Sequence, residues 1–184
     1  MQPSSLIAVL DANVLYPFTL RDTLLRAAAT GLFQARWSDK ILDEATRNLV
    51  ADHVVTEQQA AHLRAAMTAA FPEARVTGFD KLVATMRNDP KDRHVAAAAV
   101  KAKAKVIVTL NVRDFRPLPD GLEAQTPDQF LVSLFDPDPR LLVDIVRGQS
   151  VALRRPPRSL AEVVDALARV VPVFARRVRA HSSE

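Results

Sequence analysis

Ser5-Leu-Ile-Ala-Val-Leu-Asp11 is a short apolar run that stops at an acidic residue. An uninterrupted apolar run of this length is typical of a strand buried on both faces, as the strands of parallel sheets are. Lys105-Val-Ile-Val-Thr-Leu110 has the same character and is the clearest strand of the sequence. Because parallel strands end at one edge of a sheet, the residues that follow the two runs are predicted to meet there.

Helical segments separate the predicted strands. Further short strands are expected at residues 34–37, 74–77 and 122–125, and helices at 19–30, 38–50, 56–70 and 80–87, in the Ala-rich segment after Asp92 and after Pro127. Strands that alternate with helices predict an α/β fold, in which a mainly parallel central sheet is flanked by helices.

The end of the chain forms a different kind of segment. Phe135-Asp-Pro-Asp-Pro139 breaks the pattern, and two helices are predicted beyond it, at about 140–151 and 159–180. Pro172 is expected to kink the second helix or to end it early, because proline cannot donate a helical hydrogen bond. We therefore divide the chain into a body, residues 1–135, and a helical C-terminal extension, residues 136–184.

The positive charge of the protein lies in this extension. The chain has a net charge of +4, yet residues 140–184 hold nine Arg against four acidic residues, which is +5, and residues 1–139 carry −1. A basic segment favours an anionic partner, nucleic acid first. Arg154, Arg155 and Arg158, between the two predicted helices, are the candidate nucleic-acid-binding residues, and a solvated helix face is the alternative.

Composition excludes several classes of protein. A chain of 184 residues with 48% hydrophobic and 25% charged residues suits one globular domain with a small appendage. The absence of cysteine excludes disulfides, thiolate metal sites and a cysteine nucleophile, and it fits a reducing compartment, so we expect a cytoplasmic protein. No apolar run approaches the roughly 20 residues of a membrane span, and the first residues lack the basic region of a signal peptide.

Four carboxylates are placed to meet at the predicted edge of the sheet. Asp11 ends the first strand, and Asp114 follows the strand at 105–110. Glu44 lies on the shoulder of the apolar face of its helix, whereas its neighbour Asp43 points away. Asp92 lies in line with the sheet-facing stripe of the Ala-rich helix. Three of them also have an ordinary structural explanation: a turn residue for Asp11, an ion-pair partner of Arg47 for Glu44, and a helix cap for Asp92.

The convergence of these acids points to a metal ion. Uncompensated negative charges cannot be packed together without a cation. Hard oxygen ligands, with no cysteine and no paired histidine, favour Mg²⁺ or Mn²⁺ over zinc. The four histidines show no metal-ligand spacing and are expected to be surface or packing residues: His53, His62, His94 and His181.

These segments resemble the PIN-domain family of metal-dependent ribonucleases, which includes the VapC-type toxins. The resemblance covers about residues 5–130 and rests on four pieces in the family's order: Val9-Leu-Asp-Ala-Asn-Val-Leu15, Ser38-Asp-Lys-Ile-Leu-Asp-Glu44, Asp89-Pro-Lys-Asp-Arg-His-Val-Ala-Ala-Ala98 and Ile107-Val-Thr-Leu-Asn-Val-Arg-Asp-Phe115. It implies a PIN-like three-layer sandwich. It also implies that Asp11, Glu44, Asp92 and Asp114 are catalytic and bind one or two Mg²⁺ or Mn²⁺ ions, supported by Asn13, Thr109 and Asn111.

The resemblance also implies a function and partners. The expected activity is metal-assisted hydrolysis of RNA phosphodiester bonds by an endoribonuclease, the toxin of a type II toxin–antitoxin pair. A cognate antitoxin would cover the acidic cleft and place a basic residue in it, and a homodimer is expected. Many family members carry an acid where this chain has Asn111, so either Asn111 or Asp114 is the fourth ligand.

Two other functions remain open at the level of sequence. A haloacid-dehalogenase-like Mg²⁺ phosphatase would use Asp11 as its nucleophile, but that class has a second Asp where this chain has Asn13. A non-catalytic module would bind RNA or an acidic protein through the extension and keep only a vestigial acidic site.

Overall fold

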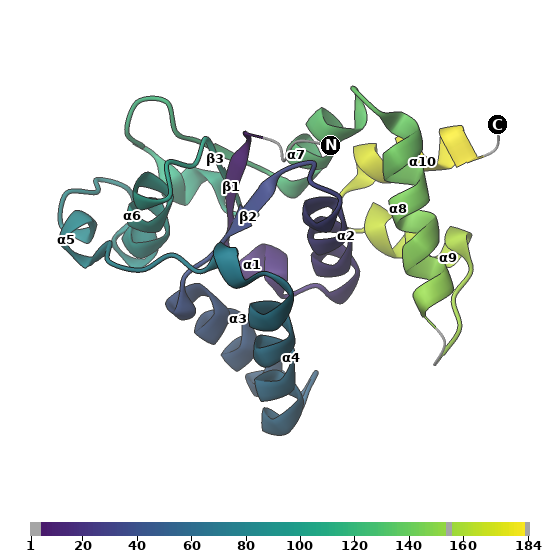
Figure 1. Ribbon diagram of the computed structural model, residues 1–184, viewed down its shortest axis with the longest axis horizontal. Coiled ribbons are helices and arrows are strands. Elements are labelled where there is room, and N and C mark those ends of the chain that lie inside the picture. The colour runs from purple at the N-terminus through teal and green to yellow at the C-terminus, as the bar shows by residue number, and fades with distance from the viewer. Residues whose placement is uncertain (1–4, 154–155, 183–184) are drawn as a thin grey trace.

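The computed structural model describes residues 5–153 and 156–182 and contains a central sheet covered by helices (Figure 1). Its elements follow in the order β1 (Ile7–Leu10), α1 (Ala12–Leu15), α2 (Phe18–Ala29), β2 (Gln34–Arg36), α3 (Asp39–Ala51), α4 (Glu57–Ala70), η1 (Pro72–Ala74), α5 (Asp80–Val83), η2 (Pro90–Asp92), α6 (Arg93–Lys101), β3 (Val106–Val108), η3 (Val112–Phe115), β4 (Glu123–Gln125), α7 (Pro127–Phe135), α8 (Pro139–Ala152), α9 (Leu160–Ala168) and α10 (Pro172–Ser182). The η elements are single 3-10 turns.

The four strands form one parallel sheet in the order β2-β1-β3-β4. Leu10, the last residue of β1, lies beside Val108, the last residue of β3. The chain leaves β1 toward β2 on one side and later returns to β3 on the other. The strand order therefore reverses between β1 and β3, and the crevice at such a point is where open α/β sheets bind ligands.

Helices cover both faces of this sheet, which confirms the predicted sandwich. α6 packs on β1 and β3, while α2 contacts β2 and α7 contacts β4 on the opposite side (Figure 1). The α6 helix can approach the sheet closely because the side chains from Ala96 to Ala99 are small. All four alanines are fully buried as a result. The close approach brings the start of α6 near the ends of β1 and β3.

Two local predictions need correction. In the described residues, the segment 74–77 forms no strand but a single parallel bridge between Trp37 and Arg75. The helix predicted at 80–87 is the short α5, because the chain turns after Val83 and buries Met86 instead of continuing. The expected interruption of the helix at 159–180 by Pro172 is confirmed: the segment is divided into α9 and α10, and Pro172 begins α10, where its missing N–H is not needed.

The C-terminal helices are packed against the body. α8 and α9 contact α2, and α10 contacts α7 and α8. The Thr23 hydroxyl of α2 donates a hydrogen bond to Gln149 Oε1 of α8 at 2.9 Å, and both residues have no solvent exposure. Buried apolar residues of the body and of the extension form one continuous cluster. The division of the chain at residues 135 and 136 stays a prediction.

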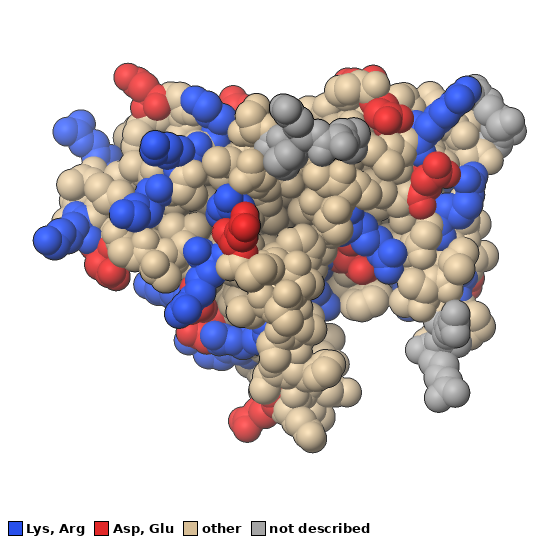
Figure 2. Space-filling view, viewed as in Figure 1, with Lys and Arg blue, Asp and Glu red and all other residues tan. Residues whose placement is uncertain are grey.

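Part of the charge of the extension is compensated by acidic neighbours. Arg147, Arg177 and Arg179 form ion pairs with Asp144, Asp136 and Asp165, respectively. Arg158 is exposed, whereas Arg154 and Arg155 lie outside the described residues. Figure 2 shows Lys and Arg side chains over the side of α5 and α6 as well as over the extension.

None of the helices in residues 5–153 and 156–182 combines the length and the apolar character that crossing a membrane would require.

Candidate active site at the carboxyl edge of the sheet

Asp11 lies directly after β1, at the point where the strand order reverses. Its backbone N–H donates to the Val108 carbonyl at 3.0 Å, and this bond extends the pairing of β1 with β3 by one residue. Its Oδ1 accepts a hydrogen bond from the Ala12 N–H at 2.8 Å and so caps α1. Asp11 is therefore both the predicted turn residue and a buried carboxylate at the ligand-binding edge, with 5% of its surface exposed.

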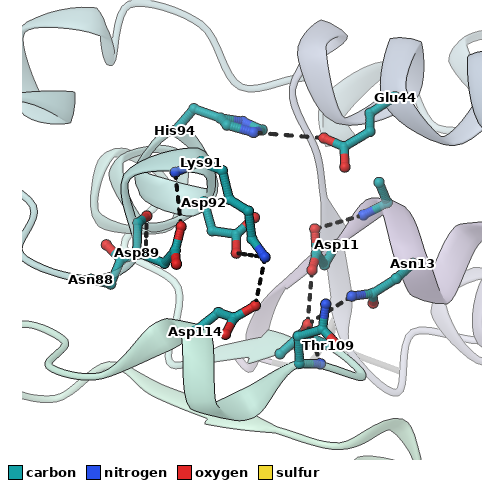
Figure 3. Close-up of polar contacts among 12 residues, drawn as sticks. Asp11, Asn13, Glu44, Asn88, Asp89, Lys91, Asp92, His94, Thr109 and Asp114 are labelled. Carbon is teal, nitrogen blue, oxygen red and sulfur yellow. Dashed lines mark hydrogen bonds and ion pairs between the residues drawn. The ribbon is translucent and has the colours of Figure 1, made fainter.

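The Thr109 hydroxyl organises this edge (Figure 3). It donates to Asp11 Oδ2 at 2.8 Å and accepts from Asn13 Nδ2 at 3.1 Å and from the Asn111 N–H at 3.0 Å. The Asn13 side-chain oxygen in turn accepts the Leu110 N–H at 3.0 Å. The three residues predicted to support the site thus lie together around Asp11, and the Asn13 amide is used to hold the loop after β3.

Asp11 and Asp92 are carboxylates whose ionised form is disfavoured. Burial raises the pKa of Asp11 above its usual range, partly offset by the hydrogen bonds from Thr109 and Ala12. Burial, together with the negative charge of Asp11, raises the pKa of Asp92 to about 6. The site therefore holds more negative charge than its protein surroundings compensate.

A lysine that was absent from the sequence-based site lies between two of the predicted ligands. Lys91 Nζ lies 2.9 Å from Asp114 Oδ2 and 3.9 Å from Asp92 Oδ2 (Figure 3). The backbone N–H of Asp89 also donates to the Asp114 carbonyl at 3.0 Å, which joins η2 to η3. Asp114 is therefore brought close to Asp92, but with the Lys91 ammonium between them.

Glu44 faces the site from α3. Its Oε2 lies 3.8 Å from His94 Nε2, which is longer than a hydrogen bond. Burial, with the nearby charge of Lys40, lowers the pKa of His94 to about 4, so the imidazole is neutral near pH 7 and the contact is not an ion pair. Asp43, the neighbour of Glu44, is exposed and pairs with Arg64 of α4, as its predicted outward direction requires.

Several of these side chains line one cleft with a volume of about 680 Å³, whereas Asp114, Thr109 and His94 are not among its lining residues. Asp11, Glu44 and Asp92 contribute its acidic part, and Asn111 lines it as well. The remaining lining residues are Asn13, Tyr16, Pro17, Arg47, Asn48, Ala51, Asp52, Lys91 and Leu110.

Several buried polar atoms around the start of α6 have no hydrogen-bond partner among the described residues. Of the four buried side-chain atoms without a hydrogen bond in the described part of the chain, three belong to Asn88, Asp92 and His94. Buried polar atoms are normally satisfied, and Asp92 is the one of these three residues that lines the cleft, so its unsatisfied oxygen calls for a ligand or an ion there. Asp92 Oδ2 is one of these atoms, and an oxygen of this kind suits Mg²⁺ or Mn²⁺.

The donor chemistry fits a hard divalent cation, although the ligands are not drawn together. Among the described residues, no three acidic or histidine side chains are close enough to form a ready metal cluster. The Lys91 ammonium supplies part of the compensating charge instead. Residues Asp11, Glu44 and Asp92 line the cleft together, and which of Asn111 and Asp114 completes the set stays open.

Sequence reasoning missed Lys91 and the place of His94. Lys91 lies in the turn Asn88-Asp-Pro-Lys-Asp92, directly before the predicted ligand Asp92, and this adjacency was the available signal. His94 was expected to be a surface or packing residue, and it is indeed buried, but beside Glu44. His94 follows Asp92 by two residues, on the α6 helix whose sheet-facing stripe the sequence had already indicated.

Comparison with known proteins agrees with this geometry. The family model described as PIN domain matches residues 8–113, and the model described as VapC50 C-terminal domain matches residues 127–180. A protein of Mycobacterium tuberculosis with the name "Putative ribonuclease VapC50" is 38% identical over 105 residues, which cover 55% of this chain and 62% of that protein. The chain thus spans less than two thirds of the length of this relative. No solved structure matches the chain.

Proposed function

Because the chain belongs to the PIN-domain family, whose model spans residues 8–113 of its 184, we propose that it is a Mg²⁺- or Mn²⁺-dependent endoribonuclease. The observation that carries this proposal is the convergence of Asp11, Glu44 and Asp92 on one cleft where the strand order of the sheet reverses. We propose further that the enzyme is the toxin of a type II toxin–antitoxin pair, as the likeness to a VapC protein suggests.

Asp11, Glu44 and Asp92 are the residues that would hold the metal, with Asn111 or Asp114 as the fourth ligand. A bound divalent cation supplies charge stabilisation and a more acidic water for phosphodiester hydrolysis. The Thr109 hydroxyl fixes the carboxylate of Asp11 through the 2.8 Å hydrogen bond, so that Asp11 needs no reorganisation when a ligand arrives. Lys91 places a positive charge beside the acids, where it can meet an RNA phosphate.

An RNA cleavage assay with Mn²⁺ tests the proposal. Asp11→Asn and Glu44→Gln are expected to lower the rate on the order of 10²-fold or more, because each removes charge from the cleft. Asp43→Asn is the matched control: it lies one residue from Glu44 but pairs with Arg64 outside the cleft, so its rate should stay close to wild type.

Equal weak cleavage by the wild type and both acidic-site variants would contradict nuclease activity. RNA binding without cleavage would then support the non-catalytic module, and hydrolysis of a small phosphate monoester would support the phosphatase. The phosphatase class has a second Asp where this chain has Asn13. The Asn13 amide donates a hydrogen bond to Thr109 and accepts one from the Leu110 N–H, which supports a positioning role for it.

We also propose two protein partners. A small antitoxin is expected to cover the acidic cleft and to place a basic residue in it, and a second copy of the chain is expected to form a homodimer. An open reading frame beside the gene, and sedimentation of the purified chain as a dimer, are the matching observations. We also propose a cytoplasmic location, because a chain without cysteine fits a reducing compartment.

A further inference from the structure

The volume of the cleft is larger than a metal ion alone requires. A volume of about 680 Å³ falls in the range of pockets that enclose a whole small ligand. The carboxylates of Asp11, Glu44 and Asp92 occupy one part of it. The other part, which we call the distal cleft, is bordered by Tyr16, Pro17, Arg47, Asn48, Ala51 and Asp52.

One face of α3 forms a wall of the distal cleft. Glu44, Arg47, Asn48 and Ala51 follow the spacing i, i+3, i+4 and i+7, which places them on one side of a helix. The core of the protein uses a different side of α3, on which Ile41, Ala45 and Leu49 are buried. Arg47 and Asn48 are exposed and lie outside this buried side, and Arg47 and Ala51 border both the cleft and a neighbouring hollow against α4.

Tyr16 also lines the distal cleft and is tied to the end of α3. It follows α1, five residues after Asp11, which is about 7.5 Å along a helix. Its hydroxyl donates to Asp52 Oδ2 at 2.8 Å, and its carbonyl accepts a hydrogen bond from the buried Arg21 side chain at 3.1 Å. The backbone and the hydroxyl of Tyr16 are thus both hydrogen-bonded, and Tyr16 and Pro17 both line the cleft.

We propose that the distal cleft is a nucleobase subsite, in which the base next to the scissile phosphate stacks on Tyr16. This inference rests on the proposed nuclease function. Single-stranded RNA is recognised by aromatic rings that stack with bases and by polar groups that contact base edges. Tyr16 and Pro17 supply the flat apolar surface, Asn48 and Arg47 supply hydrogen-bonding groups, and the small side chain of Ala51 leaves room for the base.

The single tyrosine of the chain allows a direct test. Protein labelled with 3-fluorotyrosine has one ¹⁹F resonance, which reports Tyr16. Adenosine and uridine 5′-monophosphates, which contain no phosphodiester bond to cleave, are titrated into it, and ribose 5-phosphate is the matched ligand without a base. We expect the nucleotides to shift the resonance to saturation and ribose 5-phosphate to leave it in place. No shift with any of them, or equal shifts with all three, would overturn the subsite.

Variants test the same subsite during RNA cleavage. Tyr16→Leu is expected to raise KM about 5- to 150-fold, the loss of one base–aromatic stack, whereas Tyr16→Phe keeps the ring, loses only the hydrogen bond to Asp52 and should raise KM less. Mn²⁺ affinity should be unchanged in both. Ala51→Gln fills the cleft from the exposed side of α3 and should raise KM as well, even if Tyr16→Leu fails to fold.

The two proposals fail in different ways. Absence of RNA cleavage by the wild type contradicts the nuclease function, while the ¹⁹F titration still decides whether a base binds beside Tyr16. Normal cleavage with unchanged KM in Ala51→Gln and in folded Tyr16→Leu overturns the subsite and leaves the nuclease in place.

Discussion

Lys91 places a cation among carboxylates that we assign to a metal. Its ammonium contacts Asp114 and lies near Asp92, so a divalent ion that binds these acids must overcome its repulsion. Lys91→Gln is therefore expected to tighten Mn²⁺ binding roughly three- to tenfold, a modest effect because the lysine is solvent-exposed. Isothermal titration calorimetry with Mn²⁺ measures it.

Lys40→Gln is the control for Lys91, because it also removes a positive charge near the site. Lys40 affects His94 but forms no ion pair with the cleft carboxylates among the described contacts. An equal gain in Mn²⁺ affinity from both substitutions would show that only the net charge matters and that Lys91 does not compete for the site.

Asp92 makes the metal-free protein less stable at neutral pH. Its pKa is about 6 in the folded protein and near 4 in an unfolded chain, so the folded form binds the proton more tightly. The stability cost is thus absent below about pH 4, grows as the pH rises, and is complete above about pH 6. Asp92→Asn should stabilise the metal-free protein by about 2–3 kcal/mol at pH 8.

Urea unfolding in the presence of a chelator measures the effect of Asp92→Asn. The gain in free energy of unfolding should shrink as the pH is lowered from 8 to 4. A gain that is the same at both pH values, or a loss of stability at pH 8, would contradict an uncompensated Asp92 carboxylate.

At the scale of elements, Asp128 joins the body to the last helix. Its two carboxylate oxygens accept the backbone N–H groups of Val173 and Phe174, at 3.1 and 2.9 Å, at the start of α10. Asp128→Ala should lower the free energy of unfolding by about 0.5–2 kcal/mol, as the loss of a helix cap does. Asp128→Asn keeps the acceptor oxygen and should recover most of it in the same urea titration.

The elements that the sequence predicted well are those with strong patterns. β1 and β3 are uninterrupted apolar runs, and the helical periodicity of α3 correctly separates Glu44 from Asp43. The weaker patterns failed: α5 is short, and α1 was not predicted, because four residues carry no periodicity. The sequence did not indicate that Lys91 and His94 lie at the site, because it does not reveal which loop η2 approaches. In the structure, the backbone hydrogen bond from the Asp89 N–H to the Asp114 carbonyl joins η2 to η3.

At the scale of the whole molecule, the extension cannot be treated as a removable tail. It shares a core with the body, so a truncated chain would expose apolar surface of α2 and α7. Substitution of the arginines is the better test of RNA binding. Arg154, Arg155 and Arg158 changed together to Gln should make the dependence of RNA affinity on salt less steep, by up to about two to three in the logarithmic slope.

Arg177→Gln is the control for this triple substitution, because Arg177 already pairs with Asp136. Fluorescence anisotropy of labelled RNA between low and physiological salt gives both slopes. An unchanged slope in the triple variant would assign these arginines to an ordinary solvated surface.

The packing of α8 and α9 on α2 also determines when the protein can become complete during its synthesis. The ribosome makes α2 before α8 and α9, and Thr23 lies on the face of α2 that is buried against Gln149 of α8. Because chains fold progressively as they are made, this face of α2 stays open until α8 and α9 have emerged. The core that the body shares with the extension is completed only then.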